Sequence, residues 1–238
     1  MSKFPFIASV AIATVMTSVA FAATPTARDT GTINYAGIGD DLGAWHGALY
    51  AGTATRNAQF SGSRTAEIDF SRYNVILGYD LTRWLTIYGL AGAANADADN
   101  RSDDSSSGLF GAGFWAGLLE VDQLSFLTTI SRYRVNSGAE ISYAGFDEFS
   151  WTQFDGFLTL ELQNELNNTS SIFPDNIGLF FGPVVSFFES DEYDSDSDNL
   201  VGMTVGVNLM FTDDTYLTGA GDFFSDDSSV YGMMGVRF

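Results

Sequence analysis

The sequence predicts an all-β protein, a single antiparallel, up-and-down transmembrane β-barrel of about ten strands. Three observations indicate this fold: a first segment typical of exported proteins, long stretches in which apolar and polar residues alternate, and connectors that are short and long in turn. Eight and twelve strands stay open as alternatives. A soluble, exported β-sandwich also stays open, because its strands alternate in the same way.

The first segment has the composition of a secretory signal peptide. Lys3 precedes an apolar run from Phe4 to Phe21, and the small residues Ala22 and Ala23 follow. This order predicts export with cleavage near Ala22 or Ala23. We therefore expect a signal peptide at 1–23, an N-terminal tail or plug at 24–43 and an outer-membrane barrel at 44–238.

Alternation is clearest at 201–211, where every second residue from Val201 to Phe211 is apolar and those between are mostly small or polar. Eleven tilted residues rise about 27 Å, close to the ~25 Å apolar band of outer-membrane barrels. A change of phase between Phe70 and Tyr73 indicates a β-bulge. The candidate strands are 45–55, 66–79, 85–94, 110–118, 124–135, 154–163, 177–188, 201–211, 216–224 and 230–238.

Connector lengths largely alternate along the chain. Segments 80–83, 120–123 and 212–215 are short, whereas 95–107, 136–149 and 189–199 are long and polar. In outer-membrane barrels the short turns are periplasmic and the long loops external. The connector 164–176 departs from this pattern, since it should be short and is long.

Two stretches resemble the small bacterial outer-membrane barrels, the group around outer-membrane protein A and its porin-like relatives. They are the strand-turn-strand segment 77–85 and the final segment 230–238, which alternates up to Val236 and Phe238. The resemblance implies that Val236 and Phe238 form the signal read by the barrel-assembly machinery. It also implies the outer membrane of a Gram-negative bacterium, with membrane lipid and lipopolysaccharide as neighbours, but no particular activity.

Composition excludes several functions. There is no Cys, which excludes disulfides, zinc-thiolate sites and a Cys nucleophile. Without Lys3 the chain keeps nine Arg against 30 Asp and Glu, a net charge of −21 that would repel nucleic acid. His46 is the only His and is expected near the periplasmic rim, away from the external end where outer-membrane proteases work, so we expect no enzyme activity.

The external segment 189–199 is strongly acidic, which predicts either a hydrated loop or weak Ca²⁺ or Mg²⁺ bridging to lipopolysaccharide. It does not match an EF-hand, since Asn199 and Val205 stand where Gly and Glu are needed. We expect no firm metal site and no other cofactor. The candidate cation ligands are Glu189, Asp191, Glu192, Asp194, Asp196 and Asp198.

Charged residues at inward positions predict a polar lumen, either plugged by ion pairs or lined as a narrow path. Inward Gly111, Gly113, Gly202 and Gly206 would leave space on one wall. The leading hypothesis is a non-enzymatic structural or interaction barrel with acidic external loops, and the alternative is a small cation-preferring channel. The candidate lumen charges are Arg72, Arg132, Arg134, Asp155, Glu161 and Arg237.

Overall fold

The computed structural model describes residues 45–60, 64–82, 84–98, 105–124, 130–145, 150–166, 173–190, 201–211, 215–225 and 227–238. The expected signal peptide and the segment 24–43 lie outside these residues. The described part of the chain contains no helix long and apolar enough to cross a bilayer.

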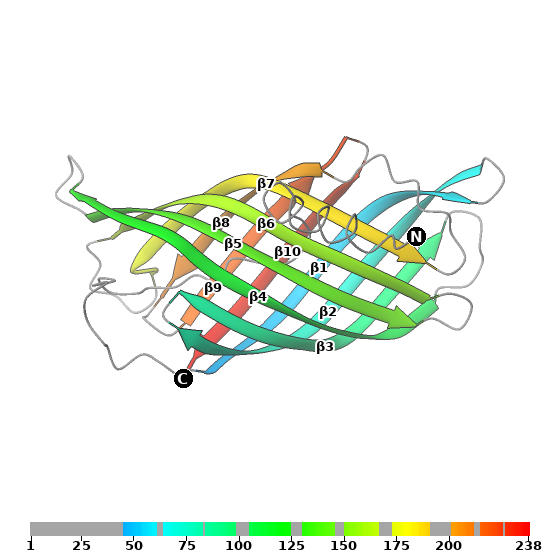
Figure 1. Cartoon of the computed structure of the whole chain (residues 1–238), viewed down its shortest axis with the longest axis horizontal. Helices are drawn as coiled ribbons and strands as arrows, with labels where there is room; N and C mark the ends of the chain where they lie inside the picture. Colours follow the sequence, from blue (N-terminus) through cyan, green and yellow to red (C-terminus); the bar gives the residue numbers. More distant parts are fainter. Residues whose placement is uncertain are drawn as a thin grey trace, which may run out of the picture.

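Ten strands close into one antiparallel barrel, in the order β1-β10-β9-β8-β7-β6-β5-β4-β3-β2 (Figure 1). The predicted fold and strand number are therefore confirmed, and the sandwich and the eight- and twelve-stranded alternatives are wrong. The strands are β1 Trp45–Phe60, β2 Arg64–Thr82, β3 Leu85–Ala98, β4 Ser105–Leu124, β5 Ile130–Gly145, β6 Ser150–Glu165, β7 Asn176–Ser190, β8 Val201–Met210, β9 Thr215–Phe223 and β10 Ser228–Arg237.

The chain ends meet where β1 begins and β10 ends. Backbone hydrogen bonds of 2.8 and 2.9 Å join Trp45 to Phe238. We call this side of the barrel the terminal end and the opposite side the loop end. The wall is uneven at the loop end, because β1 pairs with β2 as far as Phe60 but with β10 only as far as Thr55.

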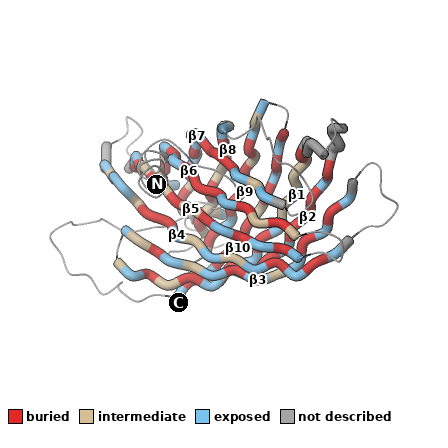
Figure 2. Tube along the Cα trace, turned by 45° about the vertical axis from the view of Figure 1, so that its right-hand side comes forward, coloured by how far each residue is buried: buried red, intermediate tan, exposed pale blue. Residues whose placement is uncertain are grey.

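Burial follows the strand alternation and is inverted relative to a soluble protein. The exposed positions carry large apolar side chains such as Leu49, Val205 and Met234, whereas buried positions include four Arg side chains among those described. Figure 2 shows the result as buried and exposed residues alternating along each strand. The apolar face that the sequence predicted for β8 is therefore the outer face of the barrel.

Three local expectations are wrong. The predicted short connector 120–123 belongs to β4, which extends to Leu124. Phe70 faces inward with Arg72 while Tyr73 faces outward, so β2 keeps one phase there, and its register shifts only between Asp80 and Thr82. The polar segment 136–149 is not a loop throughout, since β5 extends to Gly145. These errors have one cause: the inner face holds apolar as well as polar residues, so inner strand positions resemble a bulge, a turn or a loop in the sequence.

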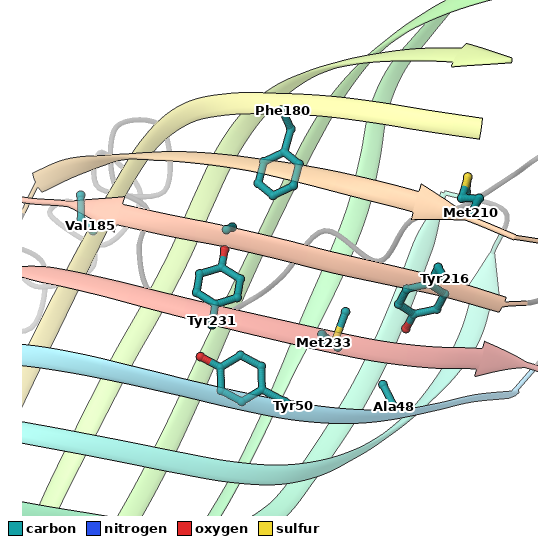
Figure 3. Close-up of a cluster of buried hydrophobic side chains, with 9 residues drawn as sticks. Ala48, Tyr50, Phe180, Val185, Met210, Tyr216, Tyr231 and Met233 are labelled. Atoms are coloured by element: carbon teal, nitrogen blue, oxygen red, sulfur yellow. The ribbon is translucent and has the colours of Figure 1, made fainter. Parts of the chain in front are cut away.

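The inner wall is filled by aromatic side chains that pack over glycines. Figure 3 shows one cluster, in which Phe180, Tyr231 and Tyr50 project from different strands into the barrel. A Cβ on Gly206 would overlap the ring of Phe180, and one on Gly113 would lie 2.5 Å from the ring of Tyr88. The predicted free space beside these glycines is therefore occupied.

Candidate functional site

The candidate site is the barrel interior, and its first part lies at the terminal end around Asp80. This carboxylate has no exposed surface and receives groups from three other strands. His46 Nε2 on β1 lies 3.0 Å from Oδ1, Arg237 Nη2 on β10 lies 3.0 Å from Oδ2, and the Thr86 hydroxyl on β3 donates to Oδ1. The pairing of β1 with β10 closes the barrel, and we call this pair of strands the closing seam. Asp80 on β2 binds a side chain from each of the two strands.

A second charged group lies on β4 and β5, near the same end. Glu120 forms an ion pair with Arg132, whose Nε lies 3.1 Å from Oε1, and its Oε2 accepts a hydrogen bond from Arg134 Nε at 2.8 Å. All three side chains are less than a tenth exposed. One carboxylate thus neutralises part of the charge of two neighbouring guanidinium groups in a low-dielectric interior.

Glu161 on β6 organises a hydrogen-bond chain along the wall. Its carboxylate accepts from Asn136 Nδ2 at 3.0 Å and from Asn208 Nδ2 at 2.8 Å, and Thr218 donates to Asn208 Oδ1 at 2.7 Å. The strand between Glu161 and Asn208 is β7, which carries Gly178 at this level. A side chain there would collide with the Glu161 carboxylate, so the glycine lets the bond pass.

The middle of the barrel holds a group we call the central cluster: Arg72, Glu140, Asp155 and Asp222, from β2, β5, β6 and β9. All are buried, and Arg72 interacts electrostatically with Tyr50 and with the three carboxylates. Glu140 accepts from the Tyr88 hydroxyl at 3.0 Å, and Asp222 accepts from Ser229 at 2.8 Å. Each carboxylate therefore has a neutral hydrogen-bond donor on its own side of the barrel.

Contacts from one wall to the other cross the lumen on the loop side of this cluster. Arg56 Nη2 on β1 donates to Ser186 Oγ on β7 at 2.7 Å, across the width of β10, β9 and β8. Ser186 in turn donates to Asp155 Oδ1 at 3.0 Å. The guanidinium also lies 5.8 Å from the centre of the Phe224 ring.

An aromatic group crosses at the same level. The rings of Phe70 on β2 and Trp151 on β6 lie 4.3 Å apart edge-to-face, although three strands separate them in the sheet. Phe188 on β7 lies 5.6 Å from Trp151 and 5.9 Å from Phe70. We call these three residues the aromatic crossing; like the bond between Arg56 and Ser186, it joins side chains of strands that are not neighbours in the sheet.

The structure places the sequence-derived lumen charges as follows. Arg72, Arg132, Arg134, Asp155 and Glu161 are buried, and Arg237 is partly exposed and bound to Asp80. They do not meet as one group, because they lie in the separate networks just described. Sequence reasoning missed Asp80, Glu120, Glu140 and Asp222, which it had assigned to turns, loops or a strand margin; their inward position in the alternation was the available signal.

The other predicted sites lie at the ends of strands or outside the described residues. Of the acidic segment, Glu189 is exposed at the end of β7, and Asp191, Glu192, Asp194, Asp196 and Asp198 lie outside the described residues. Val236 and Phe238 point outward at the terminal end. No group of three or more His, Cys, Asp or Glu suited to a metal ion occurs within the described ranges.

An apolar outer face around a polar, charged interior defines the class of protein: a β-barrel of the membrane type. No protein-family model and no curated protein sequence matches the chain. Among solved structures, an outer membrane channel from Pseudomonas putida F1 is similar, with a TM-score of 0.37 and 12% identity over 88% of this chain and all of the other.

Two further barrels show the same kind of likeness. Ail, the attachment invasion locus protein of Yersinia pestis, solved with a heparin analogue, has a TM-score of 0.26 and 9% identity over 83% of this chain and 99% of its own. The CymD monoaromatic hydrocarbon channel has a TM-score of 0.23 and 6% identity over 82% and 88%. These likenesses concern the fold alone.

Proposed function

We propose that this protein is a non-enzymatic outer-membrane barrel of a Gram-negative bacterium, closed in its loop half, which acts as a structural or interaction protein rather than as an open channel. The observation that carries the proposal is the pair of lumen crossings, Arg56 to Ser186 and Phe70 to Trp151. A hydrogen bond and an edge-to-face ring pair that join opposite walls obstruct the path of a hydrated ion.

Location in a membrane is supported by the outward side chains. Burying polar groups inside and exposing Leu, Val, Phe and Met outside is favourable only if hydrocarbon surrounds the barrel. The acidic segment near Glu189 follows β7 at the loop end, which would place its negative charge outside the cell and near lipopolysaccharide, with divalent cations between them.

The absence of enzyme activity is part of the proposal and is supported by the surroundings of His46. Its Nε2 faces Asp80, which also binds Arg237, and the nearby Thr86 hydroxyl donates to Asp80 rather than to the imidazole. An activated nucleophile would have to donate to the imidazole itself. The role of His46 is therefore structural, since it binds Asp80 and so links β1 of the closing seam to β2.

Conductance in planar lipid bilayers tests the closed state. We expect no conductance steps from the folded natural chain, and clear steps from the triple variant Arg56→Ala/Phe70→Ala/Trp151→Ala, which removes both lumen crossings. The matched control is Phe154→Ala/Phe187→Ala, a ring pair 6.0 Å apart on the outer face of β6 and β7, which should stay silent.

Two results would overturn the proposal. Regular cation-selective steps from the natural chain would establish the channel alternative, for which the three carboxylates of the central cluster would be the selectivity element. Recovery of the folded protein in the soluble periplasmic fraction, without a mobility shift between unboiled and boiled samples on a detergent gel, would refute the membrane location.

A further inference from the structure

The central cluster contains a buried positive group that its carboxylates do not reach. Arg72 is 5% exposed, and its Nη1 has no hydrogen-bond partner. Its register neighbours on β1 and β3 are Gly52 and Ala94, whose side chains carry no acceptor; the Tyr50 hydroxyl lies over Gly52 but forms no hydrogen bond with Nη1. A buried guanidinium with an unpaired N–H is unusual in proteins, because such groups are nearly always bonded.

On the opposite side of the cluster, a buried acceptor atom has no hydrogen-bond partner. Asp155 has no exposed surface; its Oδ1 accepts from Gln153 at 2.9 Å and from Ser186 at 3.0 Å, whereas its Oδ2 has no partner. Glu140 is the direct cross-strand neighbour of Asp155, so two carboxylates lie side by side on this wall. Arg72 interacts with both through space.

An unpaired donor and an unpaired acceptor thus face the same interior from different strands, and their pairing requires an occupant with both kinds of group. An inorganic anion would be repelled by Glu140, Asp155 and Asp222. A bare metal ion would be repelled by Arg72, and the described residues hold no suitable ligand set. A small molecule with a carboxylate at one end and an ammonium at the other satisfies both sides.

We propose that the central cluster binds a small zwitterion of the α-amino acid class, with its carboxylate on Arg72 and its ammonium group on Asp155 and Glu140. The ligand enters from the terminal end, because the crossings of Arg56, Phe70 and Trp151 close the loop side. Toward the terminal end, the networks of Asp80, Glu120 and Glu161 join strands near one another and run along the wall.

Calorimetric titration of the folded, detergent-solubilised protein tests the proposal with three probes: L-alanine, N-acetyl-L-alanine, which lacks the ammonium group, and L-alaninamide, which lacks the carboxylate. We expect L-alanine to bind at least tenfold more tightly than either analogue. Equal affinity for all three, or no binding of L-alanine, overturns the proposal and means that water alone completes Arg72 and Asp155.

Two variants locate the site. Arg72→Met keeps much of the side-chain volume and should reduce L-alanine affinity to that of L-alaninamide, whereas Arg132→Met, which alters the Glu120 group at the terminal end, should leave it unchanged. Undiminished binding by Arg72→Met would refute the assignment. Folding is checked by the detergent-gel mobility shift, and if Arg72→Met does not fold, the comparison of the three probes on the natural chain still decides. Bilayer conductance is a separate readout, so failure here leaves the closed-barrel proposal standing.

Discussion

Replacing Asp80 by Ala removes a carboxylate on which side chains from three other strands converge. His46, Thr86 and Arg237 all lose their interaction with this carboxylate, and the Arg237 side chain is 13% exposed. Removing one member of a buried ion pair costs about 3–5 kcal/mol. Because water can hydrate the exposed part of Arg237, we expect a loss of unfolding free energy in the lower part of that range, about 3 kcal/mol.

Urea titration of the protein folded into lipid vesicles, followed by tryptophan fluorescence, measures this loss. The matched control is Asp69→Ala, which removes an outward-facing carboxylate on the same strand whose described hydrogen bond comes from Thr55 at 2.6 Å. Exposed substitutions of this kind usually change stability by no more than about 0.5 kcal/mol. If Asp80→Ala and Asp69→Ala lose the same free energy, Asp80 does not fasten the seam and the reasoning fails.

Two further substitutions test the packing of the two faces. Gly206→Ala should destabilise the barrel by roughly 1–3 kcal/mol in the same titration, since the new Cβ would displace the Phe180 ring. Gly219→Ala should be neutral, because no atom lies within 4 Å of the new Cβ. Equal effects of the two substitutions would contradict this packing. Val205→Arg, on the outer face of β8, should reduce the free energy of unfolding in vesicles by about 2–4 kcal/mol, because its charge would face hydrocarbon. Glu189→Arg, at the end of β7, should leave that free energy unchanged. A Val205→Arg variant of undiminished stability would place the barrel outside hydrocarbon.

Alternation predicted the strands well where the inner face is uniformly small or polar. In β8, Thr204 and Asn208 alternate with outward Val and Met, and the structure confirms the strand from Val201 to Met210. Prediction was poorer where the inner face is apolar or the strand is very long. Phe70 was read as a change of phase, and Asn136 and Glu140 were read as part of a loop.

Partners inside the barrel could not be predicted in the same way. The rule that places a charge inward says nothing about which strand it meets, and side chains as far apart in sequence as Arg237 and Asp80 meet at a distance of 3.0 Å. Asp80 itself was assigned to a turn, because a polar residue next to a short connector is usually solvated.

The sequence by itself predicted the class of fold and the two faces of the wall, because backbone pairing and a period of two residues are local properties of a strand, but it left eight and twelve strands open beside ten. Only the tertiary structure decided the content of the lumen. Closure, tilt and stagger of the strands set which inward side chains share a level. They bring Phe70 against Trp151, join Arg56 to Ser186, and leave Arg72 and Asp155 each with an unpaired polar atom in the barrel interior.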